Sequence, residues 1–202
     1  GLMTPKPALV QRMADALGVK EAYLYGKGIE IDIPMLRSTS QDRLTDEEEH
    51  RLAEHLACVA ERYILLEEKT KLQKRFFNPL ANITVSNKDE AEQAAIRLRK
   101  EWQIGSGEIP SVARLLERKG IRIFMAPMPD HILGVSTWGS RIYPIIALSD
   151  NQENTTVERT RFTLAHELGH LLLNIRPECD KERICNQFAG TLLLPPQTLK
   201  EE

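Results

Sequence analysis

Residues 161–173 read RFTLAHELGHLLL, and this stretch determines how the rest of the chain is interpreted. Its apolar residues recur with a helical period, so the sequence predicts a largely buried helix that begins near Thr156 and ends before Pro177. His166 and His170 lie four positions apart on this helix, which places both side chains on one face, one turn from each other. Their ring nitrogens can therefore meet on a single metal ion.

Glu167 follows the first histidine and points roughly 100° away around the helix axis, because an α-helix has about 3.6 residues per turn. It lies too far round to be a natural third ligand, but it is well placed to take a proton from a water on the metal. Zinc lowers the pKa of such a water from about 15.7 towards about 7, so a carboxylate can deprotonate it at neutral pH. The pattern is typical of a zinc peptidase in which Glu167 is the general base.

Two simpler interpretations compete with this one. A five-residue pattern with three fixed positions also arises by chance, and two helical histidines can belong to a solvated face. The apolar neighbours argue against both, because burying two histidines and a glutamate without a shared purpose is costly. Gly169 costs about 1 kcal/mol relative to alanine inside a helix, which indicates close packing or ligand approach there.

A third ligand has to come from outside the motif, because a catalytic zinc normally has three protein ligands and one open position. Residues 174–180 (NIRPECD) turn the chain, so a last helix, predicted over residues 181–194, can fold back across the motif helix. Glu182 at the start of that helix is one candidate. The sequence leaves four rivals open, namely Cys185, Asp180, Cys179 and Glu178.

The remaining pattern predicts an α+β fold with a mainly helical N-terminal region. Helices are expected over residues 7–17, 20–25, about 46–74, about 88–102 and 110–119, and strands over 121–125, 134–138 and 141–148. Asp46 is interpreted as the N-cap of the long helix and Pro110 as a first-turn proline. Residues 27–44 are expected to be irregular, and the best domain boundary lies around residues 76–88.

Composition narrows the class of protein. The 202 residues include 42% hydrophobic residues, enough for a sizeable core, and a formal net charge of -2 gives no overall basic field for nucleic acid. The sequence contains no apolar stretch of about 18 residues and no signal-peptide pattern at its start. Its cysteines, Cys58, Cys179 and Cys185, are few and odd in number, which favours a reducing cytoplasm.

Two stretches resemble the ImmA/IrrE family of bacterial metallopeptidases. They are residues 161–173 and residues 182–189 (ERICNQFA), the latter followed by LLLP at 192–195. The resemblance covers about residues 88–196 and implies a zincin-like core, in which the motif helix packs against a small twisted sheet. An edge strand of that sheet would offer backbone groups to an extended substrate.

By the pattern of that family, His166, His170 and Glu182 would hold zinc, and Glu167 would be the general base. Such proteins commonly cleave or inactivate a helix-turn-helix repressor, often in mobile-element or stress-response circuits. A Tyr or His often stabilises the oxyanion in zincins, and Tyr143 and His131 are candidates, although a structural role is more common for such residues.

The first residues are similar to a different family. Residues 1–19 resemble the segment that follows the recognition helix in a phage-repressor-type helix-turn-helix domain. The alternative is that residues 1–26 are only two small packing helices. The first interpretation divides the chain into a remnant of a DNA-binding domain at 1–28, a helical linker region at 29–87 and a zincin-like metallopeptidase domain at 88–202.

Two functions follow as hypotheses. The first is a cytoplasmic zinc endopeptidase that cleaves a helix-turn-helix repressor or a related regulatory protein. The second is a transcription regulator whose zinc domain senses a ligand or partner without cutting, and a structural zinc site is a weaker third. DNA would be contacted only through the incomplete N-terminal domain, no membrane contact is expected, and the apolar stripe of the helix at 46–74 could pair chains as a homodimer.

Overall fold

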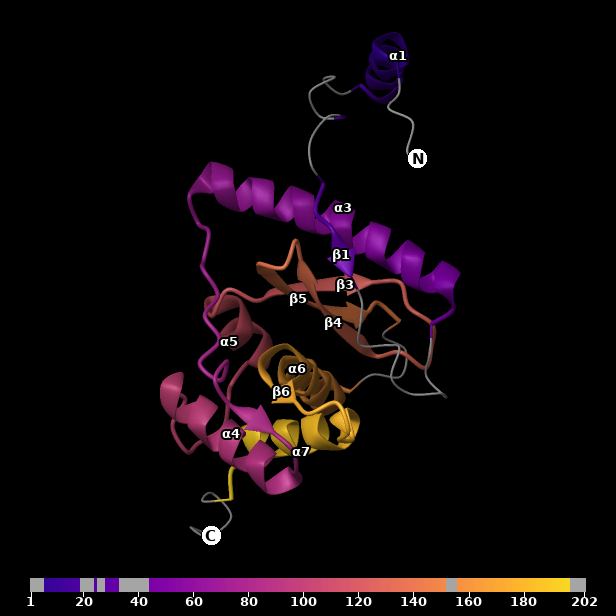
Figure 1. The fold of residues 1–202 in the computed structure, drawn as a ribbon. Coiled ribbons are helices and arrows are strands. Elements are labelled where there is room, and N and C mark those ends of the chain that lie inside the picture. The colour runs from indigo at the N-terminus through magenta and orange to yellow at the C-terminus, as the bar shows by residue number, and fades with distance from the viewer. Residues whose placement is uncertain (1–5, 19–23, 25–27, 33–43, 152–155, 197–202) are drawn as a thin grey trace.

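The computed structural model describes residues 6–18, 24, 28–32, 44–151 and 156–196. Its helices are α1 (Pro7–Leu17), α3 (Asp46–Thr70), α4 (Lys88–Glu101), α5 (Val112–Arg118), α6 (Val157–Leu172) and α7 (Lys181–Leu193). Its strands are β1 (Ile31–Asp32), β2 (Thr84–Val85), β3 (Arg122–Ala126), β4 (Gly134–Gly139), β5 (Tyr143–Ser149) and β6 (Asn174–Ile175). The architecture is mixed α+β, with α3 on one side of a small sheet and α6 on the other (Figure 1).

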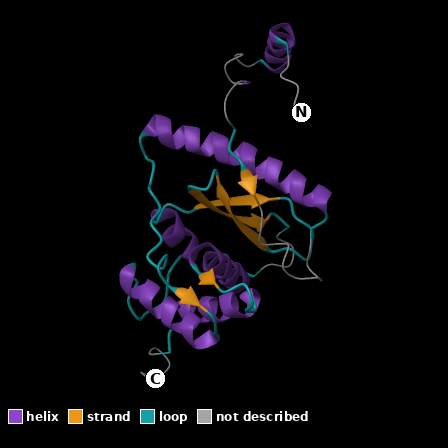
Figure 2. Cartoon of the chain, viewed as in Figure 1, coloured by secondary structure: helices purple, strands orange, loops and turns teal. Residues whose placement is uncertain are grey.

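The main sheet has the strand order β1-β4-β5-β3. β4 and β5 form an antiparallel hairpin in which Ser136 lies opposite Ile146, and β3 runs parallel to β5. β1 pairs antiparallel with the last two residues of β4. A second sheet joins β2 to β6 in parallel, with Thr84 opposite Asn174, and so connects two segments that are far apart in sequence (Figure 2).

The two faces of the main sheet belong to two hydrophobic cores, because successive strand residues point to opposite sides. Ile146 and Leu148 of β5 lie in the core that the sheet shares with α4, α5, α6 and α7. Ile145 and Ala147 lie in the second core, beneath α3. α3 closes this second core with residues four apart, namely Leu52, Leu56, Ala60 and Ile64.

The predicted start of the long helix was wrong by one residue. Thr45, not Asp46, is the N-cap of α3: its side chain accepts a hydrogen bond from the Glu48 backbone N–H, and Glu48 accepts one from the Thr45 backbone N–H at 2.8 Å. This reciprocal capping box satisfies two backbone donors. The helix also ends earlier than predicted, because Lys71 adopts a left-handed conformation with φ 56°.

Three short strands escaped prediction because a two-residue strand is too short to show alternation. They are β1, which lies in a segment predicted to be irregular, and the pair β2 and β6. α5 begins at Val112 rather than Pro110, because Ser111 caps it. The helix predicted over residues 20–25 lies almost entirely outside the described residues. In the parts of the chain that are described, none of the helices combines the length and apolarity needed to cross a bilayer.

Candidate metal centre

α6 carries the two motif histidines between the sheet and α7. Thr156 caps its start by accepting a hydrogen bond from the Arg159 backbone N–H. Gly169, in its last turn, lets α7 approach closely: a Cβ atom at this position would lie 3.2 Å from Cys185 Sγ. The close packing that a glycine inside the helix predicted is confirmed, because side chains of α7 lie directly against Gly169 of α6.

Glu182 reaches the motif because the chain reverses directly after α6. β6 holds the start of this reversal by pairing with β2, and Asp180 then caps α7 by accepting a hydrogen bond from the Arg183 N–H at 3.0 Å. Glu182 therefore occupies the first turn of α7, where the helix dipole favours a carboxylate. The cap fixes the direction of α7, and its first turn faces the histidines of α6.

The side chains of His166, His170 and Glu182 converge on one point. The two Nε2 atoms are 3.0 Å apart, and the Glu182 carboxylate oxygens lie 3.1 Å from the first and 3.3 Å from the second. A tetrahedral zinc with nitrogen and oxygen ligands at about 2.0–2.2 Å separates neighbouring ligand atoms by about 3.3 Å. Within the described residues, these three are the one group of His, Cys, Asp or Glu whose ligand atoms gather this closely. The spacing fits a zinc ion.

Hydrogen bonds behind the ligands point their lone pairs inward. His166 Nδ1 lies 2.9 Å from Asn186 Oδ1, and because an amide oxygen only accepts, the imidazole proton sits on Nδ1. The Nε2 lone pair then faces the second imidazole and a carboxylate, which is unfavourable unless a cation or a proton lies between them. His170 Nδ1 is 3.4 Å from Cys185 Sγ. Such partners fix the ring orientation and tautomer of metal-binding histidines.

Protonation is the alternative to a metal in this cluster. Burial by itself would lower the pKa of His166, but the hydrogen bond to Glu182 and the charges of Glu167 and Glu182 together outweigh burial and raise it. Hydrogen bonds from His166 and His170 hold the pKa of Glu182 well below its usual range. Without metal, the cluster therefore forms an ion pair between the His166 imidazolium and the Glu182 carboxylate at pH values below the raised pKa of His166.

Glu167 reaches from α6 to β4, and its charge also acts on His166. Its carboxylate accepts a hydrogen bond from Ser136 Oγ at 2.7 Å, and both residues are buried. Ser136 was not among the residues that the sequence predicted for the site. The alternation of β4 carried the relevant signal, because it makes Ser136 the one hydroxyl among the three positions, Gly134, Ser136 and Trp138, that share a face.

The rival ligands lie elsewhere. Cys179 Sγ donates to the Ser86 carbonyl at 3.1 Å, and Asp180 is occupied as the cap of α7. Glu178 is exposed. Cys185 contacts His170 Nδ1 rather than the Nε2 atom that faces His166. Burial, together with the nearby charges of Glu182 and Glu167, raises the pKa of its thiol. A neutral, buried thiol packs as a small apolar group.

The two oxyanion candidates belong to the other side of the sheet. Tyr143 packs against the core beneath α3, and its ring centroid lies 4.7 Å from the guanidinium carbon of Arg122. His131, in the connection between β3 and β4, is exposed and lies close enough to Glu48 of α3 to act on its charge. The described geometry gives neither residue a role at the metal centre.

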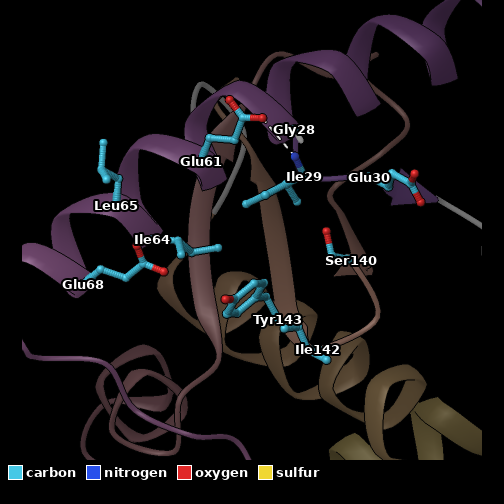
Figure 3. Close-up of a pocket in the computed structure, with 10 residues that line it drawn as sticks. All are labelled: Gly28, Ile29, Glu30, Glu61, Ile64, Leu65, Glu68, Ser140, Ile142 and Tyr143. Carbon is cyan, nitrogen blue, oxygen red and sulfur yellow. Dashed lines mark hydrogen bonds between the residues drawn. The ribbon is translucent and has the colours of Figure 1, made fainter. Parts of the chain in front are cut away.

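An acidic cavity of about 840 Å³ opens between α3 and the turn that joins β4 to β5 (Figure 3). Its charged lining residues are Glu30, Glu61 and Glu68, and Glu61 accepts a hydrogen bond from the Ile29 backbone N–H at 2.9 Å. None of the residues of the metal centre lines this cavity. The cavity is therefore a separate feature from the metal centre.

Comparison with known proteins bears on the C-terminal part of the chain. A search of curated proteins gave no match. Residues 116–202 match the family model Peptidase M78, which is described as the IrrE N-terminal-like domain. All side chains of the metal centre, from Ser136 to Asn186, lie within this segment. The match supports the resemblance of this segment to the ImmA/IrrE metallopeptidases, which are zinc-dependent.

Proposed function

We propose that this protein is a zinc-dependent endopeptidase with a zincin-like core that acts in a bacterial regulatory system. Its proposed substrate is a helix-turn-helix repressor or a related regulatory protein. The observation that carries the proposal is the convergence of His166, His170 and Glu182 next to the buried carboxylate of Glu167. The family match of residues 116–202 supports metallopeptidase chemistry.

Each residue has a defined role in the proposed mechanism. Held by His166, His170 and Glu182, zinc would supply Lewis-acid chemistry that polarises the scissile carbonyl and makes water easier to deprotonate. Glu167 accepts the proton of the attacking water as the water oxygen adds to the carbonyl carbon. The same carboxyl group then gives the proton to the amide nitrogen as the C–N bond breaks. Acid–base catalysis of this kind contributes about 10²–10⁴-fold.

The regulatory setting rests on resemblance. Residues 1–28 are proposed to be the remnant of a helix-turn-helix domain and would be the route to DNA, in a cytoplasmic protein. Residues 29–87 are proposed as a linker region and residues 88–202 as the metallopeptidase domain. Since α3 covers one face of the sheet, this linker region packs on the peptidase domain as well as preceding it. The homodimer is still proposed, but the apolar stripe of α3 that was expected to pair two chains packs on the sheet of its own chain instead.

A second candidate function is a transcription regulator whose zinc domain senses a ligand or partner without cutting. The position of α1 supports it. This helix belongs to the proposed remnant of the DNA-binding domain, and it lies apart from the sheet and its covering helices, as a separate DNA-contacting part would (Figure 1). A sensor needs the ligands but not the base, whereas a peptidase needs both. Glu167 therefore separates the two functions.

The test compares wild type with Glu167→Gln, measuring bound zinc and cleavage of a co-expressed candidate repressor. We expect the variant to keep its zinc and to lose cleavage by about 10²–10⁴-fold, because its amide cannot accept the proton. Glu158→Gln, in the exposed first turn of the same helix, is the matched control and should cleave normally. Equal cleavage by a zinc-loaded Glu167→Gln variant would show that the peptidase mechanism is wrong.

A further inference from the structure

Ser136 and Glu167 form a buried contact that connects the sheet to the proposed base. The exposed fractions of the two residues are 1% and 7%, and the Ser136 hydroxyl donates to Glu167 Oε2 over 2.7 Å. Hydrogen bonds from a hydroxyl to a carboxylate are short and about twice as strong as those between neutral groups. The contact therefore constrains a side chain that otherwise rotates about three bonds.

The sheet offers little room at this point. Gly134, two residues earlier on the same face of β4, is packed so closely that a Cβ atom there would lie 2.8 Å from Thr163 Cγ2 of α6. A short side chain with one donor suits such a narrow gap. The hydroxyl has a single proton, which it gives to Glu167 Oε2, so the second carboxylate oxygen is left to accept a proton.

We propose that Ser136 is the positioning residue of the metal centre, which holds Glu167 so that one chosen carboxylate oxygen faces the attacking water. This inference rests on the proposed function. The hydroxyl acts through Glu167 and touches neither the substrate nor the three ligands. A misplacement of about 1 Å in a catalytic group can cost about 10²-fold in rate, so a single buried hydrogen bond is enough to matter.

The kinetic test uses the zinc-loaded protein and the repressor that the wild type cleaves. Ser136→Ala should lower kcat by about 10–100-fold with KM within about twofold, because only the orientation of the base changes. Ser136→Thr keeps the hydroxyl but adds a methyl group in this narrow gap, so it should recover only part of the rate. Ser136→Cys keeps a short side chain with a weaker donor and should give an intermediate rate, and it serves where the alanine variant folds poorly.

A double-mutant cycle separates positioning from simple support of the fold. In a Glu167→Gln background, Ser136→Ala should cause no further loss, because the group through which it acts is already gone. An equal loss in both backgrounds would overturn the proposal, as would a raised KM with unchanged kcat. Thr137→Ala is the matched control, since Thr137 is equally buried on the same strand but lies on the opposite face.

A second readout needs neither metal nor substrate. In protein labelled with ¹³C at the glutamate carboxyl groups, the resonance that disappears in Glu167→Gln should shift in Ser136→Ala and stay in place in Thr137→Ala. A resonance that does not move would refute the contact. Failure of the proposed function looks different, because Glu167→Gln would then leave cleavage unchanged whatever happens at Ser136.

Discussion

Two polar clusters lie on opposite faces of the same sheet, and they differ in how their charges are balanced. On the α3 face, Arg122 donates to Glu67 at 2.6 Å and to the Gly120 carbonyl at 3.1 Å, with its guanidinium over the Tyr143 ring. This cluster has one cation and one anion in direct contact. Its charges are therefore balanced by its own side chains.

The cluster on the α6 face has an excess of acid. Glu182 is bound to two histidines and Glu167 to a serine, so neither carboxylate meets a lysine or arginine in these hydrogen bonds. Both imidazoles direct Nε2 towards the same point. The difference between the faces indicates that the first cluster is structural, whereas the second calls for a cation from outside the chain.

The largest expected effect is the loss of zinc on removing a proposed ligand. Glu182→Ala should weaken zinc binding by well over about 100-fold, because removing partners behind the ligands already costs about 10–100-fold. Zinc titration against a competing chelator measures this change. Glu178→Ala, an exposed glutamate in the turn before α7, is the control and should bind like wild type. Unchanged affinity in Glu182→Ala would mean that this residue is not a ligand.

Breaking the balanced cluster should affect folding and leave metal binding alone. Arg122→Met should lower the free energy of unfolding by about 3 kcal/mol, because it leaves the Glu67 carboxylate largely buried and unpaired. The double variant Arg122→Met/Glu67→Met should recover most of that loss, since Arg122 Nε is already buried without a partner. Urea unfolding and zinc titration provide the two measurements. Reduced zinc affinity in Arg122→Met would show that the two faces are coupled.

The smallest expected effect is a pH dependence of the metal-free protein. The raised pKa of His166 stabilises the fold below the ordinary value of 6.5, and this contribution is lost as the pH rises through the folded value. The lowered pKa of Glu182 stabilises above the ordinary value of 4.5, and this contribution is lost as the pH falls through the folded value. The ion pair should therefore contribute most between pH 4.5 and 6.5.

Thermal unfolding across this range, with and without zinc, measures that contribution. With zinc, the stability should instead rise as the pH rises above 6.5, because protons compete with the metal for the same nitrogen and oxygen atoms. Glu182→Gln should flatten the dependence in the metal-free protein. A metal-free stability that rises steadily above pH 6.5 in wild type would contradict the ion pair.

Local patterns predicted the elements well where they were long. The apolar periods located α1, α4 and α7 to within a residue or two, together with the start of α6, and the alternation located β3 and β4. The motif helix ends at Leu172, earlier than the predicted limit at Pro177. The ends of the elements depend on capping geometry, and neighbouring residues can be equally good caps by sequence, as Thr45 and Asp46 are at the start of α3. β1, β2 and β6 depend on partners far away in the chain, so no local pattern announces them.

The metal centre also divides into residues that local spacing predicts and residues that depend on distant parts of the chain. His166 and His170 are adjacent on one helix, so their spacing alone places them together. Glu182 was one of five candidates from spacing, and the reversal between α6 and α7 decides which of them reaches the histidines. Ser136 comes from a different element, and its contact with Glu167 requires knowing which face of β4 meets α6.

The short pairing of β2 with β6 has a consequence for the order in which the molecule is built. The candidate ligands leave the ribosome close together. The chain reversal that directs Glu182 to the histidines, however, depends on β2, which is made about ninety residues earlier: β6 pairs with β2, and the Asn174 side chain donates a hydrogen bond to Thr84. Closing so long a loop is slow compared with forming a helix. A nascent chain thus has its two histidines before Glu182 is held in place, so the candidate ligand cluster forms only once the surrounding fold has closed.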